Sequence, residues 1–476
     1  MSEFKIVDNW NSVKTEILIP YLNNRNLKSK KCKPSNKDLY LVINEKLDLP
    51  LYQHINNQSV FMTIKYIFYK IRSGIFVSIK NNKLECFIPF ANNNYKNNWS
   101  NNVTLFGTKN NDVKEYVKVK RQHVKSYGRY MFNVAKWYSN AFIINNEIRE
   151  DVWGQHSLQE YYEILEETLN NHKVNNCIFI INKRDGPILH KDLLEPYPNL
   201  YPKDSNDNNV HRSFSQSSIA NPPRIEDERL INHNYIPILS PYSNKDYMDI
   251  PFVIPQDWML ANESINYYTV SDNDNVKWED KIETAFFRGS ATGSMELEFN
   301  QRLQLTKLDN DLKDIDPTLL DGGIVSWNSR DKIDSNLQIN YIKPKELANQ
   351  GITLKERVPM NEQLKYKYLI NIDGHSFVNR MSYLLKCGSL ILMVESKFVV
   401  GNQCWFSHLL IPYEHYVPIK FDLSDLVDQI KWCRANDDKC KDIAKNSLKF
   451  YNKYLTKEAI MNYAAYMLNS ISSKYN

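Results

Sequence analysis

The sequence predicts an α/β protein with two large domains. Its 476 residues are more than one ordinary core holds. Hydrophobic residues make up 42% of the chain and aromatic residues 12%, so there is enough apolar surface for packed cores and the protein should be globular. In the second half, strand-like and helix-like segments alternate, and this alternation predicts a parallel, doubly wound sheet.

The first half shows the same classes of element less regularly. Residues 60–69 fit a helix or a strand, and residues 74–90 predict a hairpin around a turn at 81–82. A capping serine and apolar residues at helical spacing predict a helix over 157–170, and the apolar run 177–181 predicts a buried strand. Helix, turn and buried strand in this order are typical of an α/β domain.

A polar stretch at 201–229 predicts a long exposed loop, followed by a short strand at 236–239. A second polar stretch at 271–280 marks the boundary between the domains. Beyond it we expect strands at 285–287, 323–327, 368–372 and 389–394, and helices at 297–307 and 376–386. Residues 423–470 are helical by periodicity.

The composition argues against several classes of function. The formal charge of +5 comes from 60 basic and 55 acidic residues without long basic runs, which does not favour nucleic-acid binding. No apolar run approaches the roughly 18 residues of a membrane span, and residues 1–12 lack the features of a signal peptide. Seven cysteines without a C-x-x-C pair indicate reduced thiols. We therefore expect a cytoplasmic protein with no membrane span.

The segment from Phe287 to Gly293 (FRGSATG) follows a predicted strand. A glycine-containing turn between a strand and a helix brings backbone N–H groups to an anion, so a phosphate could bind here. The segment is neither a Walker loop nor a G-x-G-x-x-G fingerprint. Taken alone, it fits a plain strand-to-helix turn as well.

The segment from Asn371 to Arg380 (NIDGHSFVNR) also ends a predicted strand and precedes a helix, the position at which open α/β sheets bind ligands. Arg380 could offer a forked cation to a diphosphate, and His375 and Ser376 could donate hydrogen bonds. The alternative is that Arg380 forms a surface ion pair and Ser376 caps the helix. Two such turns in one sheet favour a nucleotide.

Asp185 lies in the turn NKRDGP directly after the predicted strand 177–181. A carboxylate at the end of a strand can act as a general base, although Asp-Gly-Pro is also ordinary turn chemistry. The aspartate pairs 272/274 and 309/311 imitate the D-x-D motif that holds Mn²⁺ or Mg²⁺, but such pairs arise by chance in a chain rich in Asn and Asp. No metal site is expected.

Several of these segments together resemble the family 90 glycosyltransferases, the group that includes the protein O-glucosyltransferases and the capsule-associated xylosyltransferases. The resemblance extends over roughly residues 157–455. Its strongest block is 365–390, and the smaller blocks are 182–187, 286–290, 415–418, 422–424 and 435–438. Residues 1–150 look unlike the cellular members.

The resemblance implies a GT-B-like architecture of two Rossmann-like domains facing a cleft. It divides the chain into an N-terminal extension of unclear role (1–150), an acceptor-side domain with the catalytic base (151–280) and a nucleotide-sugar domain with C-terminal helices (281–476). It also implies inversion without an essential metal, with Asp185 as the general base and a UDP-sugar (UDP-glucose or UDP-xylose) as donor. The acceptor would be a hydroxyl of a glycan or a protein.

The resemblance assigns residues to two binding sites. The donor candidates are Arg288, Ser290, Thr292, Gly293, His375, Ser376, Phe377, Val378, Asn379 and Arg380. Several cellular members carry arginines where this chain has Ala291 and Glu296, and Arg302 is the expected substitute. The acceptor candidates are Asp249, Asp257 and Trp258, of which Trp258 fits either a sugar-stacking platform or a core residue.

The sequence thus predicts an inverting, metal-independent glycosyltransferase of a protist or a large DNA virus, in the host cytoplasm or the virion. Two alternatives stay open. One is a glycan- or nucleotide-binding protein of the same fold that has lost turnover, because Ala291 and Glu296 fall at the donor site. The other is a metal-dependent GT-A-type transferase, which requires an aspartate pair to bind a cation beside the donor.

Overall fold

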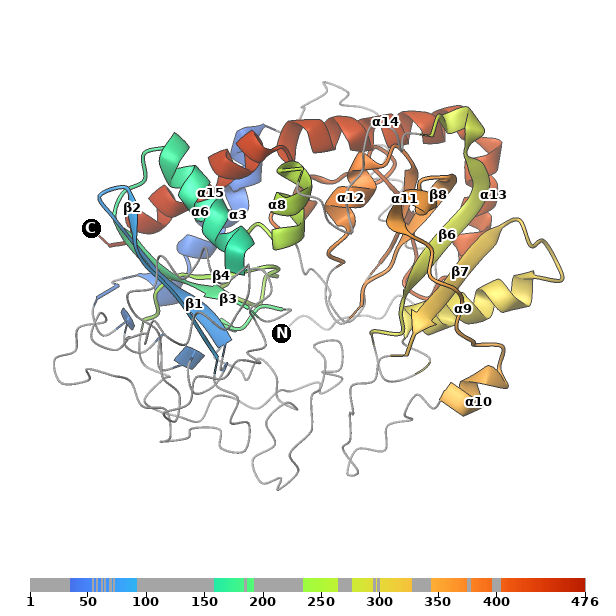
Figure 1. Cartoon of the computed structure of the whole chain (residues 1–476), viewed down its shortest axis with the longest axis horizontal. Coiled ribbons are helices and arrows are strands. Elements are labelled where there is room, and N and C mark those ends of the chain that lie inside the picture. Colours follow the sequence, from blue (N-terminus) through green and yellow to red (C-terminus); the bar gives the residue numbers. More distant parts are fainter. Residues whose placement is uncertain are drawn as a thin grey trace, which may run out of the picture.

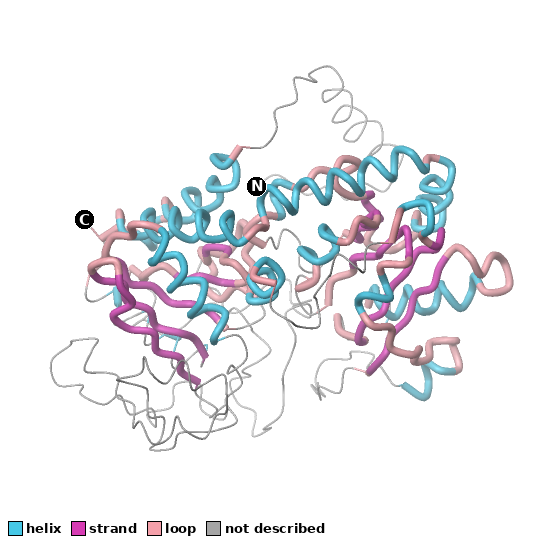
Figure 2. The backbone as a smooth tube through the Cα atoms, turned by 45° about the horizontal axis from the view of Figure 1, so that its top comes forward, coloured by secondary structure: helices cyan, strands magenta, loops and turns pink. Residues whose placement is uncertain are grey.

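Two five-stranded sheets, each covered by helices, form the protein (Figure 1). The computed structural model describes residues 35–53, 55–56, 59–60, 63, 66–67, 71, 73–91, 158–183, 186–191, 234–263, 276–293, 297, 300–327, 344–374, 378–395 and 404–475. Figure 2 shows the two groups of strands as separate layers, with helices passing from one to the other.

The first sheet has the strand order β2-β1-β3-β4-β5. Its strands are β1 (Ser73–Lys80), β2 (Lys83–Ala91), β3 (Cys177–Asn182), β4 (Ile238–Ser240) and β5 (Ile250–Pro251). β1 runs antiparallel to both of its neighbours, whereas β3, β4 and β5 are parallel to one another. The carboxyl ends of β3, β4 and β5 therefore share one edge.

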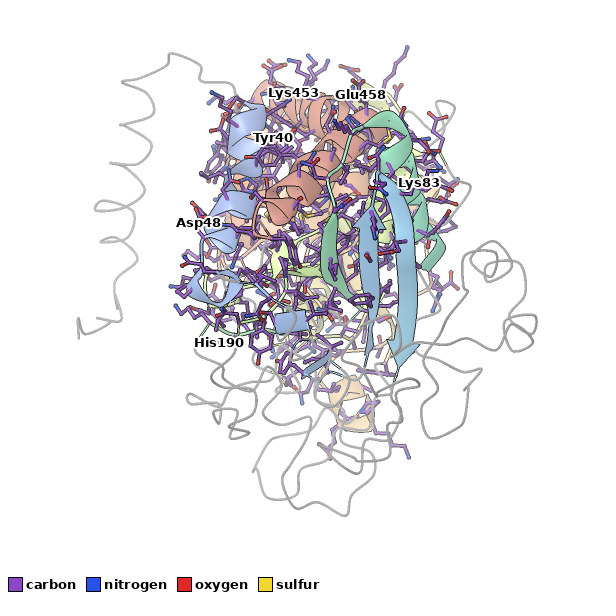
Figure 3. All side chains as sticks on the ribbon, turned by 90° about the vertical axis from the view of Figure 1, so that its left-hand side faces the viewer. Tyr40, Asp48, Lys83, His190, Lys453 and Glu458 are labelled. Atoms are coloured by element: carbon purple, nitrogen blue, oxygen red, sulfur yellow. The ribbon has the colours of Figure 1, made fainter. Side chains whose placement is uncertain are left out.

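The predicted hairpin is confirmed as β1 and β2. Asn81 and Asn82 at its tip have φ values of 52° and 59°, and a two-residue turn with positive φ at both positions matches the twist of the flanking strands. Both strands come from the region expected to be an extension, and so does α3 (Asn36–Leu47), which packs against the C-terminal helix α15 (Lys457–Ser472). In Figure 3 Tyr40 of α3 points toward the C-terminal helices, and its ring stacks on Tyr466 at 4.0 Å between centroids.

The second sheet is parallel throughout, in the order β10-β9-β8-β6-β7. Its strands are β6 (Ile282–Ser290), β7 (Leu320–Ser326), β8 (Tyr366–Asn371), β9 (Leu390–Val394) and β10 (Val417–Ile419). The chain goes from β6 to β7 on one side and then returns to place β8 on the other side of β6. The predicted doubly wound sheet and the α/β, GT-B-like fold class are confirmed.

Alternate residues of β6 enter different cores, as the two-residue period of a strand requires. Ala285 and Phe287 pack with α9 (Gln301–Leu312) and α13 (Leu426–Ala435), whereas Phe286 packs with α12 (Met381–Lys386). Helices therefore cover both faces of the second sheet, and both faces of β6 are apolar.

The chain returns to the first sheet through its last two helices. α14 (Asp437–Tyr454) runs along the top of Figure 1, and α15 continues over the first sheet. Ser472 donates a hydrogen bond to the Asn176 carbonyl at 2.8 Å, and Asn469 donates one to the Lys173 carbonyl at 3.0 Å. One apolar cluster runs from β3 through α15 to α12, so the two sheets share a core.

Other boundaries differ from the sequence prediction. A helix not foreseen, α8 (Pro255–Ala261), begins at a proline in its first turn, where the missing N–H costs nothing. The helix after β8 begins at Met381, with Arg380 as its N-cap, so Arg380 precedes the helix instead of lying one turn inside it. α9 begins at Gln301 because the Asn300 side chain accepts the Leu303 N–H at 3.1 Å and caps the helix there.

Replacing Leu468 of α15 by alanine should lower the free energy of unfolding by about 2–5 kcal/mol, because Leu468 is fully buried in the shared core. Urea denaturation measures the change. The matched control is Leu41→Ala on α3, where the side chain is 52% exposed, and the expected effect is within about 0.5 kcal/mol. Equal effects of the two substitutions would contradict the packing described for α15.

Candidate functional site at the carboxyl edge of the second sheet

The order of strands creates a switch point between β6 and β8. The connections that leave these two neighbours run in opposite directions, and open α/β sheets bind their ligands at this place. The turns that follow the two strands lie against each other there. A Cβ atom added at Gly374 would come 2.7 Å from the Thr292 hydroxyl and 3.1 Å from Nη2 of Arg302. Only glycine allows this approach of the two turns.

Arg302 of α9 joins the two strand ends. Its Nη1 donates to the Ser290 carbonyl at 3.0 Å and to the Thr292 hydroxyl at 2.6 Å, on the β6 side. On the β8 side, Nε donates to the Asp373 carbonyl at 3.1 Å and Nη2 to the Ile372 carbonyl at 3.0 Å. Arg302 is only 9% exposed. The planar fork of arginine suits these spread acceptors, so Arg302 fixes the geometry of the site.

Arg380 brings a second guanidinium to the same place. Its Nη1 donates to the Arg288 carbonyl at 3.0 Å, and its guanidinium lies 4.9 Å from the centroid of the Phe287 ring. The Arg302 guanidinium lies 5.5 Å from the same centroid. Two cations held this close in a partly buried setting create a positive potential at the switch point. Such a potential suits an anionic ligand.

Arg288 is placed differently from the expectation. Its Nη2 makes a bidentate contact with the Asp321 carboxylate at 2.9 and 3.0 Å, and Lys355 lies 2.8 Å from the same carboxylate. Burial opposes ionisation of Asp321, but the hydrogen bond from Lys355 and the charge of Arg288 outweigh it and lower the pKa of Asp321. The Arg288 side chain thus ties β6 to β7 and is turned away from the two turns.

The remaining donor candidates lie in the two turns or outside the described residues. Ser290 lies at the end of β6 and accepts a hydrogen bond from the Ser326 hydroxyl at 2.8 Å. Gly293 has a φ of 127°, which only glycine adopts readily, and Val378 is buried. Asn379 accepts a hydrogen bond from the Tyr242 hydroxyl. The candidates outside the described residues are His375, Ser376 and Phe377.

Ala291, at a position where cellular members carry arginine, is 3% exposed. It packs in a small apolar cluster with Leu303 and Ile324. This position therefore contributes packing and no charge to the site.

The first sheet contributes a buried carboxylate, that of Asp249, which directly precedes β5 and contacts the end of β4. Asp249 is fully buried and accepts hydrogen bonds from the backbone N–H groups of Ile188 and Leu189, both at 2.8 Å. The Ser240 hydroxyl donates to the same carboxylate. Burial raises the pKa of Asp249 to about 6, although these hydrogen bonds oppose the shift. Asp249 is one of the acceptor candidates. Because its side chain is fully buried, it can affect an acceptor only through the residues around it.

Further polar contacts hold the same turn. The Asn182 side chain donates to the Gly186 carbonyl at 2.7 Å and to the Ser240 hydroxyl at 3.0 Å. The Tyr66 hydroxyl donates to the Ile188 carbonyl. The segment 186–189 is therefore fixed directly after Asp185, which itself lies outside the described residues.

The other two acceptor candidates also lie in the interior. Asp257 is 2% exposed and accepts a hydrogen bond from the Trp405 indole at 2.8 Å, and burial raises its pKa to about 6. Trp258 is 1% exposed and donates from its indole nitrogen to Glu163 at 3.0 Å. An indole buried in this way offers no face to a sugar, so the sugar-stacking platform is not formed and Trp258 is a core residue.

Within the part of the chain that the structure describes, no group of three or more His, Cys, Asp or Glu side chains could hold a metal ion. Asp309, one of the predicted pair, lies 2.7 Å from Lys355 and accepts the Gly322 N–H at 2.8 Å. These contacts join α9 to β7. None of the helices in this described part combines the length and the apolar character that a membrane span requires.

The sheet topology and the basic switch point define a two-domain α/β protein with the topology of nucleotide-binding folds. The chain belongs to glycosyl transferase family 90, whose sequence profile matches residues 220–475. The resemblance inferred from the sequence is thereby confirmed.

Relatives occur in viruses and in animals. Uncharacterized protein 179R of Invertebrate iridescent virus 6 is 33% identical over 89% of this chain and 38% of its own length. Human protein O-glucosyltransferase 3 is 31% identical over 44% of this chain and 37% of its own length. The chain thus spans less than two fifths of either relative. Among solved structures, Anabaena Alr3699/HepE in complex with UDP-glucose aligns with 43% of this chain and 55% of its own, at 14% identity and a TM-score of 0.29.

Three residues that hold the sheet edges were not identified from the sequence. They are Tyr242, Ser240 and Lys46. Ser240 and Tyr242 lie at or just past the end of β4, and the rule that ligand sites form at the carboxyl ends of parallel strands would have drawn attention to them. Lys46 donates to the Asn244 and Tyr247 carbonyls, and nothing in the pattern around it signals burial.

Arg302→Lys should lower the free energy of unfolding by about 2–4 kcal/mol, because a lysine ammonium keeps the charge but cannot reach four separated acceptors. Urea denaturation measures the loss. The control is Arg434→Lys in α13, since Arg434 also donates to carbonyls of the second sheet, at Glu283 and Thr318, but is more exposed. An Arg302→Lys protein as stable as the native protein would refute the joining role of Arg302.

Asp249→Asn should change how stability depends on pH. The folded pKa of Asp249, about 6, lies above its ordinary value of 3.8. The contribution of protonated Asp249 to the free energy of unfolding is therefore fully present below pH 4 and is lost as pH rises toward 6. The native protein should lose about 3 kcal/mol relative to the variant between pH 4 and 7, at about 1.4 kcal/mol per pKa unit.

Denaturation of both proteins across this pH range measures the difference. Asp316→Asn serves as the control with the opposite sign, because the hydrogen bond from Thr318 lowers the pKa of Asp316. There the native protein should lose stability relative to the variant as pH falls. If the difference in free energy of unfolding between the native protein and Asp249→Asn does not change with pH, the pKa of Asp249 is not raised.

Proposed function

We propose that the chain is an inverting glycosyltransferase that moves a sugar from a UDP-sugar to a hydroxyl group of a glycan or a protein, without an essential metal. The single observation that carries the proposal is the switch point between β6 and β8, where two turns meet and two arginines converge, in a chain of family 90. Switch points of this topology bind nucleotides, and the positive charge suits a diphosphate.

In the proposed reaction, the donor's diphosphate lies against the turns after β6 and β8. Ser290, Thr292 and Gly293 contribute from the first turn and the segment 375–380 from the second. The acceptor hydroxyl gives its proton to the Asp185 carboxylate as its oxygen attacks the anomeric carbon. The bond from that carbon to the diphosphate oxygen breaks on the opposite face, which inverts the configuration. Arg380 neutralises the charge that develops on the departing UDP.

Metal independence fits the charges on this edge. A divalent cation in a transferase offsets the charge of the leaving diphosphate. The guanidinium of Arg380, with that of Arg302 beneath the turns, can offset the same charge. The related protein O-glucosyltransferases support glucose as donor sugar, with xylose as the alternative.

A second candidate function is binding of a nucleotide or glycan without turnover. The observation that favours it is the placement of the arginines. Arg288 is turned to Asp321, Arg302 donates to four protein acceptors, and Ala291 brings no charge. A donor site with fewer cations directed at the diphosphate would still bind the nucleotide. It would stabilise the charge on the leaving diphosphate less well.

The test measures UDP release from UDP-glucose and UDP-xylose, with and without EDTA, by the native protein and by Asp185→Asn. Release that survives EDTA and falls at least about 100-fold in the variant is expected, since general-base catalysis contributes roughly 10²–10⁴-fold. The control is Asp316→Asn, a partly exposed carboxylate beside Arg434 at the opposite edge of the sheet. UDP binding without release would favour the binding protein, and activity abolished by EDTA would favour a metal-dependent enzyme.

A further inference from the structure

A hydrogen bond connects the carboxyl edges of the two sheets. Tyr242 lies two residues past the end of β4 in the first sheet, and Asn379 lies between β8 and α12 in the second. The Tyr242 hydroxyl donates to Oδ1 of Asn379. Since both residues follow parallel strands, the two edges at which such sheets bind ligands meet at this contact.

The tyrosine end of the contact is anchored firmly. Tyr242 is 2% exposed, and its ring belongs to the core that the two sheets share. Ser240, two residues earlier, donates to the buried Asp249 carboxylate. Two residues later, the Asn244 carbonyl accepts a hydrogen bond from Lys46 of α3. The position of the Tyr242 hydroxyl is therefore set by the first sheet and by the N-terminal segment.

The asparagine end belongs to the proposed donor site. Asn379 is exposed, and its neighbour Arg380 donates to the Arg288 carbonyl while its guanidinium lies near the Phe287 ring. An exposed asparagine side chain has several rotamers of similar energy, and a hydrogen bond from a fixed donor selects one of them. The contact thus restrains the residue next to the arginine that the reaction requires.

We propose that Tyr242 is a positioning residue for the donor site, which holds the turn at 378–380 in place from the opposite domain. The inference rests on the proposed function, because it assigns the turn to the donor diphosphate. Tyr242 acts through Asn379 and touches no reacting atom. It connects the proposed acceptor side of the molecule to the proposed donor side and restrains the position of one sheet edge relative to the other.

The test is Tyr242→Phe, which removes one hydroxyl and keeps the ring in the core. The dissociation constant for UDP, measured by calorimetry, should rise about 3- to 10-fold, the range that one hydrogen bond gives. The KM for the UDP-sugar should rise in parallel, while kcat changes less. The matched control is Tyr463→Phe, because the Tyr463 hydroxyl donates to the Pro251 carbonyl at 2.6 Å and is fully buried but lies in α15. It should leave UDP affinity unchanged.

A double-mutant cycle with Asn379→Ala identifies the partner. The double variant should bind UDP no more weakly than the weaker single variant, since both substitutions remove the same bond. Fully additive losses, or a Tyr242→Phe protein whose UDP affinity stays within twofold of the native value, would overturn the positioning role.

Hydrogen exchange separates this inference from the proposed function. In the absence of any ligand, amides of 378–386 should exchange faster in Tyr242→Phe than in the native protein, and those of α15 should not. Unchanged exchange at 378–386 overturns the inference even if the enzyme is active. If the native protein does not bind UDP but exchange is faster in the variant, the proposed function is wrong. The restraint of residues 378–380 by Tyr242 is then still supported.

Discussion

A single buried guanidinium satisfies the strand ends that the topology of the second sheet leaves open. β6 and β8 are paired only as far as Phe286 and Leu369, so the last residues of the two strands are not paired with each other. Arg302 supplies donors to both sides, and Gly374 lets the turns approach closely enough for one side chain to reach them. An unpaired buried carbonyl is costly, so this arrangement leaves few alternatives for the backbone. The geometry of the candidate site follows from it.

In the first sheet, a buried group of opposite charge plays a comparable part. The Asp249 carboxylate collects two backbone N–H groups and a hydroxyl, and Lys46 and Tyr66 from the N-terminal part of the chain hold the surrounding carbonyls. A cation under one edge and an anion under the other therefore shape the two sets of turns. Buried charges with this many hydrogen bonds are expensive to form but define one conformation. Rigid turns of this kind are what a site that aligns two substrates requires.

The sequence was informative where periodicity and glycine determine structure. The alternation over 285–394 predicted the parallel sheet, and the segments 287–293 and 371–380, each between a predicted strand and helix, predicted the two turns. The direction of long side chains was not predictable. Arg288 and Arg302 were both donor candidates, yet Arg288 in β6 pairs with Asp321 of β7, whereas Arg302 in α9 lies under the turns. The burial of Trp258 was not predictable either, since α8 packs its indole against Glu163 of α6 (Leu158–Asn171), far away in sequence.

The family match begins at residue 220, yet the first sheet draws three of its five strands from before that point. A fragment cut to the matched region would keep β4 and β5 but lose β3, and with it the partner that pairs the edge of β4. α15 would also lose the surface on which it packs. The matched region alone therefore lacks strands that complete the first sheet. Strands β1 to β3 close the edge that β4 would otherwise expose, so they belong to the folded unit although they lie outside the family match.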